Sequence, residues 1–272
     1  MTTPVIFDND AGGDIDDLFA LALILAHREL DLRGVTTVGY DSQSRARLIA
    51  KMLRLAGRSA VPVAAGHSVP EALRGKNLPY ERRLTHASFV TEDDPEHGAH
   101  YQDGVAFILE ALRTTREPIT LIGTGTLMNL AEVLRQADEQ QRSMIGCLAL
   151  MGGEVHLLHA EANIRTDPEA AACVMQSGVP IFLATWSVSR QFFFTMAEVE
   201  DLCAGSSDPF IAGLLACTRL WWGQGMMAKS GPVCYDVCPV FWAAGERQGM
   251  GCIELPPIPI ELEGKLTRGI MV

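Results

Sequence analysis

The sequence predicts an α/β fold: an open, mostly parallel sheet with helices on both faces, in a single domain over residues 1–272. Short apolar runs alternate with segments whose apolar residues recur at helical spacing, which is typical of a parallel sheet covered on both sides. Polar stretches rich in aspartate or glycine follow several of the strand-like runs. Open α/β sheets bind their ligands at that position, beyond the carboxyl ends of the strands.

In the first part of the chain, strand-like and helix-like segments follow one another in turn. The strand-like runs are short and end in polar residues, whereas the helix-like segments repeat Leu, Ile and Ala three and four positions apart. We expect strands at residues 4–7, 32–38 and 61–65, and helices at 16–27 and 44–56. Residues 67–100, rich in Pro, His and charge, are expected to form a long irregular loop, which is often a binding loop.

The alternation continues through the rest of the chain. Asp167 before Pro168, with Glu169 in the first turn, is a typical helix start. We expect helices at residues 104–113, after 119–122, and at 168–176 and 237–244, a mainly helical region at 196–227, strands at 119–122, 144–151 and 179–184, and an extended segment at 253–262.

The composition excludes several classes of partner. Lys and Arg total 22 against 33 Asp and Glu, a net charge of −11 without a basic stripe, so we expect no nucleic acid partner. No apolar run reaches membrane-spanning length and no signal peptide is visible, so we expect a cytoplasmic protein without a membrane partner. The seven cysteines are expected to be reduced and mostly in the core. A homo-oligomer, a dimer or a tetramer, is expected.

Five aspartates lie between Asp8 and Asp17, directly after the first strand-like run. Carboxylates this dense repel one another unless a cation or a helix terminus compensates their charge. One interpretation is helix capping, with Asp14 as the N-cap. An EF-hand is a second interpretation, but Phe19 stands where the calcium loop needs a bidentate Glu. The third, which we favour, is a metal site at a strand-to-helix turn.

Other segments hold polar residues whose roles the local pattern leaves open. Glu161 and Asn163 precede the helix expected at 168–176 and have no evident capping task, so the alternatives are solvated loop residues or a site. Asp236 could be an N-cap of the next helix, and His100 lies in a stretch that could cap the helix from residue 104. Trp222, next to another tryptophan, is by default a packing residue.

A series of motifs runs in order over nearly the whole chain. They are D-N-D (8–10) with D-D-L-F-A-L (16–21), T-T-V (36–38), V-P-V-A-A-G (61–66), T-G-T-L-M-N (124–129), M-G-G (151–153), A-E-A-N-I-R-T-D-P-E-A-A (160–171), Y-D-V-C (235–238) and L-T-R-G (266–269). With this series the chain resembles the inosine–uridine-type nucleoside hydrolases, which cleave the N-glycosidic bond of ribonucleosides. The resemblance implies their Rossmann-like fold and a small-molecule nucleoside as substrate.

Residue by residue, the resemblance implies that the aspartate cluster holds one Ca²⁺. The side chains of Asp10, Asp17 and Asp236 match the family's metal ligands, and the backbone carbonyl of Thr124 matches a fourth. Oxygen donors of this kind suit calcium. Asp16, Glu161 and Asn163 match the family residues that hydrogen-bond the sugar. Asp8 is expected to support the metal ligands without contacting the metal itself.

The implied reaction passes through an oxocarbenium-like sugar. Asp10 would take a proton from the attacking water. At the leaving base the chain departs from the family, because Tyr235 stands where a His usually precedes the metal-binding Asp. Tyr235 and Trp222 could stack on the base, with His100 as an alternative acid, and this predicts a purine-leaning enzyme. Asp41 stands near the place of a missing family Asn and is expected to contact ribose or water.

Two rival functions remain open from the sequence. A haloacid-dehalogenase-type phosphatase also begins with a strand followed by D-x-D, but its phosphate-binding Lys and late acidic pair have only Lys229 and the single Asp236 as candidates. The other rival is a calcium-dependent nucleoside- or ribose-binding protein in which the altered residues have abolished catalysis.

Overall fold

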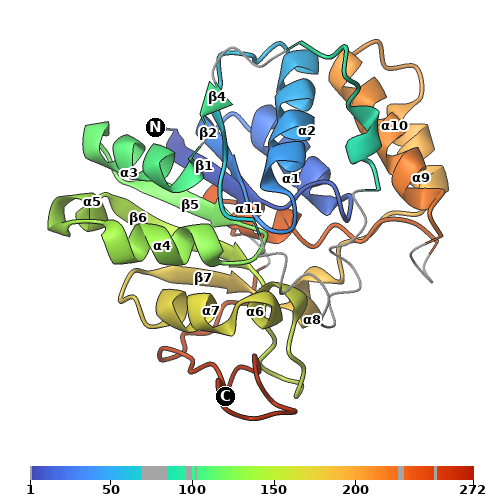
Figure 1. Cartoon of the computed structure of the whole chain (residues 1–272). Coiled ribbons are helices and arrows are strands. Elements are labelled where there is room, and N and C mark those ends of the chain that lie inside the picture. Colours follow the sequence, from blue (N-terminus) through green and yellow to red (C-terminus); the bar gives the residue numbers. More distant parts are fainter. Residues whose placement is uncertain (1, 69–84, 96–99, 102, 226–229, 248–249) are drawn as a thin grey trace.

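A seven-stranded parallel sheet forms the centre of the computed structural model (Figure 1). The structure describes residues 2–68, 85–95, 100–101, 103–225, 230–247 and 250–272, without the side chains of residues 100 and 101. The strand order is β4-β3-β2-β1-β5-β6-β7. The strands are β1 (Thr3–Asn9), β2 (Leu30–Thr37), β3 (Val63–Ala65), β4 (His100–Tyr101), β5 (Ile119–Gly123), β6 (Ile145–Met151) and β7 (Ile181–Ala184).

Helices cover both faces of the sheet, as the sequence predicts. In β1, Val5 and Phe7 pack into one apolar cluster and Ile6 into another, because successive side chains of a strand point to opposite faces. The first cluster includes residues of α1 (Asp16–Ala26), α2 (Ser42–Leu55), α10 (Pro209–Trp222) and α11 (Val237–Ala243). The second includes residues of α3 (Gly104–Thr114), α4 (Met128–Gln136) and α7 (Pro168–Met175).

The observed elements depart from the expected ones in several places. The stretch expected to be an irregular loop at 67–100 contains the 3₁₀ helix η1 (Ala87–Phe89) and the start of β4. The region expected to be mainly helical at 196–227 contains two helices, since Pro209 starts a new helix with Asp208 as its N-cap. The segment expected to be extended at 253–262 forms no strand among its described residues, apart from a bridge between Ile260 and Met271. Short helices absent from the prediction are α5 (Glu139–Ser143), α6 (Ala162–Thr166) and α8 (Trp186–Ser189), and α9 (Met196–Cys203) precedes α10.

None of the helices in the described part of the chain is both long enough and apolar enough to span a membrane.

The sheet order reverses between β1 and β5. From β1 the chain extends the sheet on one side through β2, β3 and β4, and β5 then pairs with the free edge of β1 on the other side. The carboxyl ends of these two strands therefore border the crevice where open α/β sheets bind ligands. Thr124, the residue after β5, donates its backbone N–H to the carbonyl of Asp8 at 2.9 Å, which joins the two strand ends.

A buried polar network holds the end of β1 in place. The carboxylate of Asp8 accepts hydrogen bonds from Thr36 Oγ1 at 2.6 Å and from Asn129 Nδ2 at 2.8 Å. Asn129 also donates to the Thr37 carbonyl at 3.1 Å and accepts from the backbone N–H of His67 at 2.8 Å. One buried amide thus ties together β1, β2 and the start of α4, and the role of Asp8 in supporting the cluster stays a prediction.

Replacement of Asn129 by Ala tests this network. The change leaves buried donors and acceptors unpaired, so we expect it to lower the free energy of unfolding by about 3 kcal/mol. Gln136→Ala is the matched control. Gln136 is an exposed residue of the same helix, and its side-chain amide donates a hydrogen bond to Glu132 at 2.7 Å. The control should change the free energy by less than about 0.5 kcal/mol. Equal effects in urea denaturation would contradict the anchoring role of Asn129.

Candidate active site

Three buried carboxylates converge beside the reversal of the sheet. Oxygen atoms of Asp16, Asp17 and Asp236 lie within 4.8 Å of one another. Asp16 and Asp17 begin α1, and Asp236 directly precedes α11, so two helix starts bring them together. Of the four metal ligands implied by the family resemblance, Asp17 and Asp236 belong to this triad. Asp16, expected to contact the sugar, is its third member.

Helix capping does not account for these aspartates. The N-cap of α1 is Ile15, whose side chain makes no capping bond, so the alternative in which Asp14 caps this helix is wrong. Asp14 accepts a bond from the N–H of the next residue, Ile15, at 2.8 Å. Asp236 occupies the N-cap position of α11, but its side chain makes no capping hydrogen bond either. Side-chain capping by Asp14 or Asp236 therefore does not explain why the three carboxylates converge.

The electrostatics of the triad favour a bound cation. Burial, and then repulsion from Asp10, raise the pKa of Asp17 to about 8, although a hydrogen bond from Thr124 opposes the rise. Burial and the neighbouring aspartates raise the pKa values of Asp16 and Asp236 well above the ordinary range. Without a cation, burial and mutual repulsion disfavour the ionised forms of these groups. A divalent ion would allow all three to ionise, and hard oxygen donors suit such an ion.

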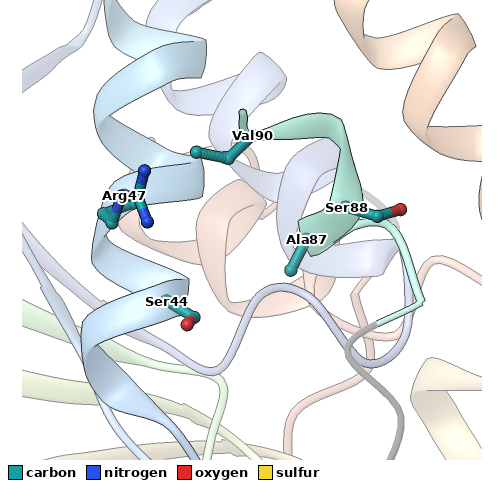
Figure 2. Close-up of a pocket in the computed structure, with 5 residues that line it drawn as sticks. All are labelled: Ser44, Arg47, Ala87, Ser88 and Val90. Carbon is teal, nitrogen blue, oxygen red and sulfur yellow. The ribbon is translucent and has the colours of Figure 1, made fainter. Parts of the chain in front are cut away.

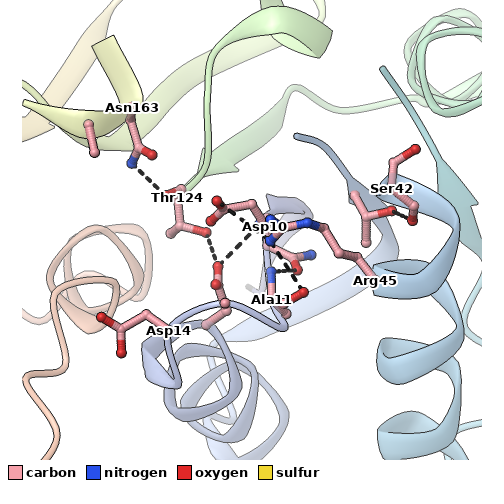
Figure 3. A network of polar contacts seen from close by, with 12 residues as sticks. Asp10, Ala11, Asp14, Ser42, Arg45, Thr124 and Asn163 are labelled. Carbon is pink, nitrogen blue, oxygen red and sulfur yellow. Dashed lines mark hydrogen bonds and ion pairs between the residues drawn. The ribbon is translucent and has the colours of Figure 1, made fainter. Parts of the chain in front are cut away.

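Asp10 lies beside the triad and faces an arginine (Figure 3). Its Oδ2 is 3.6 Å from Nη1 of Arg45, whereas its backbone N–H donates to Oδ1 of Asp17 at 3.4 Å. The carboxylate of Asp10 is not a member of the tight group of oxygens. The structure therefore places Asp10, the predicted general base, next to the triad, but the side chain of Asp10 is paired with Arg45.

Thr124 and Asn163 connect the triad to the next loop. Thr124 Oγ1 donates to Asp17 Oδ1 at 2.8 Å. Its backbone carbonyl, the fourth ligand implied by the resemblance, accepts a bond from Asn163 Nδ2 at 2.7 Å, drawn in Figure 3. Asn163 also donates to the Met151 carbonyl at 3.2 Å. The carboxyl ends of β5 and β6 are thus linked by the amide of a residue predicted to bind the sugar.

Glu161 has a structural task that the sequence pattern did not reveal. It is the N-cap of α6, where its carboxylate accepts bonds from the backbone N–H groups of Asn163, at 3.0 Å, and of Gly153, at 2.9 Å. The expectation that Glu161 has no capping task is therefore wrong, because α6 was not predicted. The carboxylate is buried, and burial raises its pKa.

Asp41 is also a helix cap. Its two carboxylate oxygens accept bonds from Ser44, one from the backbone N–H at 3.1 Å and the other from Oγ at 2.7 Å, at the start of α2. Its predicted contact with ribose or water stays a prediction.

Tyr235 directly precedes Asp236, and its phenol keeps its proton. Burial, and then Asp16 and Asp14, raise the pKa of its phenol to about 12, although a hydrogen bond with Trp186 opposes the rise. Arg190 stacks on the ring of Trp186, with its guanidinium carbon 4.4 Å from the ring centroid. The neighbour of Tyr235 is thus Trp186, which the sequence reasoning did not single out.

Two other predicted residues receive less support. Trp222 lies at the end of α10, is 38 % exposed and contacts Trp221, with ring centroids 6.0 Å apart. The backbone of His100 belongs to β4, but its side chain lies outside the described residues. The base-stacking role of Trp222 and the acid role of His100 stay predictions.

Arg45 is the main site residue that the sequence reasoning missed. Its signal is an arginine on the apolar stripe of α2, three and four positions before Leu48 and Ile49, which are both fully buried. A charged residue in a core-facing position is unusual unless it has a partner.

A separate hollow of about 240 Å³ lies between α2 and η1 (Figure 2). Its lining consists of Ser44, Arg47, Ala87, Ser88 and Val90, none of which is a predicted site residue. It belongs to the outer side of α2, where the exposed Arg47 lies.

Comparison with known proteins identifies the family of the chain. The family model described as inosine-uridine preferring nucleoside hydrolase matches residues 5–272. The chain belongs to this family. Membership confirms the resemblance drawn from the motifs and the enzyme class, N-glycosyl hydrolase, and it does not favour the phosphatase alternative.

Relatives cover the whole chain at moderate identity. The pyrimidine-specific ribonucleoside hydrolase RihA of Citrobacter koseri is 29 % identical, and the non-specific ribonucleoside hydrolase RihC of Escherichia coli is 31 % identical. Each match spans 100 % of this chain and 88 % of the relative. The solved plant nucleoside hydrolase PpNRh1 has a TM-score of 0.81 at 21 % identity, over 100 % of this chain and 86 % of that one, which confirms the predicted fold.

Gly125 gives a test of the position of Asp10 in this nucleoside hydrolase family member. A Cβ at Gly125 would lie 2.9 Å from Cβ of Asp10 and 2.8 Å from Cγ1 of Val38, which is too close. We expect Gly125→Ala to displace Asp10 and to lower kcat for nucleoside hydrolysis by about 10²-fold. Gly251→Ala, where a Cβ meets nothing within 4 Å, is the control. Similar kcat values for the two variants would show that Asp10 is not confined.

The raised pKa values predict how pH affects the metal-free protein. A carboxyl group with a raised pKa binds its proton more tightly when folded, so its contribution to stability is complete below its unfolded pKa of about 4 and is lost as pH rises through the folded value. For Asp17 that value is about 8. We expect the Tm of chelator-treated protein to fall from pH about 6 to about 9, and a saturating divalent cation to abolish the fall, because the bound carboxylates are already ionised. Equal slopes of Tm against pH with and without the cation would contradict this expectation.

Proposed function

We propose that the chain is a calcium-dependent ribonucleoside hydrolase, which releases the free base and ribose from a nucleoside. The observation that carries the proposal is the buried triad Asp16, Asp17 and Asp236, placed beside Thr124 and Asn163 at the reversal of the sheet. Family membership supports the reaction, and the donor set supports the metal.

Calcium would be held by Asp10, Asp17, Asp236 and the carbonyl of Thr124. These donors are all oxygen atoms. Burial, and then neighbouring carboxylates, raise the pKa values of Asp17 and Asp236, and a divalent ion would stabilise their ionised forms. When bound, the ion would orient a water molecule and lower its pKa. The remaining steps depend on the side chains of this chain.

Asp10 would accept the proton of the attacking water as its oxygen bonds to C1′ of the ribose. The C1′–N bond breaks in a transition state with oxocarbenium character, and the surrounding carboxylates stabilise that positive charge. Asp16, Glu161 and Asn163 would hold the ribose hydroxyls. Glu161 and Asn163 are suited to this task because hydrogen bonds to the backbone of Gly153 and Met151, at the carboxyl end of β6, fix their positions.

The base would lie against Tyr235. Since the pKa of this phenol is about 12, we propose that Tyr235 contacts the base as a neutral ring and that it is a poor general acid. A purine would offer the larger stacking surface. The relatives named above are described as pyrimidine-specific and as non-specific, so a purine preference would distinguish this chain from the first of them.

A cytoplasmic location and a homo-oligomeric assembly, a dimer or a tetramer, are proposed from the sequence alone.

Turnover of inosine and 2′-deoxyinosine tests the proposal. We expect ribose release from inosine to stop on chelation and to return with Ca²⁺. A site that hydrogen-bonds a hydroxyl rejects an analogue without it by about 10⁴-fold or more, so kcat/KM for 2′-deoxyinosine should be lower by that factor.

Three outcomes would contradict the proposal. Full activity in protein shown by elemental analysis to be metal-free would exclude the metal. Phosphate release from a phosphomonoester without ribose release would indicate a phosphatase. Saturable nucleoside binding in calorimetry without turnover would indicate a binding protein.

A further inference from the structure

Arg45 carries a guanidinium group into the interior beside the aspartates. Its side chain is 1 % exposed and lies on the same face of α2 as Leu48 and Met52. A buried cation is costly unless a charged partner compensates it. The position of Arg45 therefore indicates a specific interaction inside the protein, and not the solvent-exposed role that arginines usually have on a helix surface.

The partners of Arg45 belong to the end of β1. Nη1 lies 3.6 Å from Asp10 Oδ2 and donates to the carbonyl of Ala11 at 3.4 Å. Gly39 covers the pair with a positive φ of 93°, and a Cβ there would lie 3.7 Å from both Arg45 Nη2 and Asp10 Cβ. Because glycine reaches this backbone conformation without strain, the loop after β2 can lie against the ion pair.

No second cation contacts Asp10 among the described residues. His86 is a further titratable residue whose pKa responds to Arg45. It is fully buried in the segment before η1, and its neighbour Thr85 donates to the carbonyl of Gly13 at 2.9 Å. Burial, and then the charge of Arg45, lower the pKa of His86 to about 3, so this imidazole is neutral. The charge that Asp10 meets from the protein comes from Arg45.

The two oxygens of Asp10 are consequently not equivalent. Oδ2 is paired with Arg45, whereas the backbone N–H of the same residue is bonded to Asp17 of the triad. Gly125 limits movement on another side, since a Cβ there would lie 3.2 Å from Cγ of Asp10. The carboxylate is held close to the triad without joining its tight group of oxygens.

We propose that Arg45 is a positioning residue that holds Oδ2 of Asp10 and so leaves Oδ1 for the two tasks proposed above, contact with the cation and deprotonation of the attacking water. This inference rests on the proposed hydrolase function. In that step the water proton moves to Oδ1, the water oxygen bonds to C1′, and the electrons of the C1′–N bond leave with the base, which takes up a proton. Arg45 touches none of the reacting atoms and acts through Asp10.

Steady-state kinetics of three variants with inosine test the inference. Arg45→Met should lower kcat by about 10²-fold, as expected for a misplaced base, while KM stays within about threefold of the wild-type value. Arg45→Lys should give an intermediate kcat, because lysine restores the positive charge but lacks the planar guanidinium group, whose several N–H donors can fix the orientation of a carboxylate. Arg47→Met is the matched control: it removes an exposed arginine of the same helix, whose Nη2 bonds the Thr91 carbonyl, and should keep the wild-type kcat.

A crystal structure of Arg45→Met gives a readout that does not depend on activity. The carboxylate of Asp10 should be rotated away from the position it has beside Arg45. An unchanged Asp10 carboxylate, or a wild-type kcat, would overturn the inference, and so would a loss confined to KM. If Arg45→Met does not fold, Arg45→Lys decides: a lowered kcat at the wild-type Tm supports the inference and a wild-type kcat refutes it. An inactive wild-type chain would refute the proposed function instead, and with it the role of Arg45.

Discussion

Repulsion among buried carboxylates is the constraint on which the rest of this structure depends. The triad Asp16, Asp17 and Asp236 lies in the interior, where charges of one sign interact more strongly than in water. Arg45 compensates part of this charge at Asp10, but among the described residues it forms no ion pair with a member of the triad. The protein therefore has to protonate these groups or bind a cation, and only the second state leaves them ionised to stabilise positive charge on a sugar.

The fold supplies the framework that keeps such groups together. The triad comes from two helix starts, and the reversal of the sheet at β1 and β5 brings Thr124 next to Asp17. Hydrogen bonds of Asn129 fix Asp8 at the base of the cluster. Small residues allow the close approach, since Gly125 lies against Asp10 without space for a side chain. A rigid framework of this kind is what a catalytic site needs, because reacting groups must be positioned before the reaction begins.

Much of the fold could be predicted from the sequence because its signals are local. The continuous apolar runs of β1, β5 and β6, the apolar segment of α1 and the helical spacing of the apolar residues in α2 are visible directly in the sequence. The order of the strands could not be predicted, since it depends on pairing between distant segments. The short helix α6 was missed because five residues are too few to show a period, and the capping task of Glu161 was missed with it. Motif matching placed Asp17 and Asp236 in one site although more than two hundred residues separate them. Arg45 belongs to no motif, and its place on the apolar stripe of α2 does not identify its partner, which only the structure shows to be Asp10.

The central claim is that the aspartates at the end of β1 and at the two helix starts hold one divalent cation. Crystals grown with Ca²⁺, measured at a long X-ray wavelength where calcium scatters anomalously, test it most directly. The account predicts one strong anomalous peak per chain, bonded to Asp17 and Asp236 at calcium–oxygen distances of about 2.3–2.6 Å. A calcium-loaded crystal with no peak between these carboxylates, or with its peak elsewhere on the chain, would contradict it.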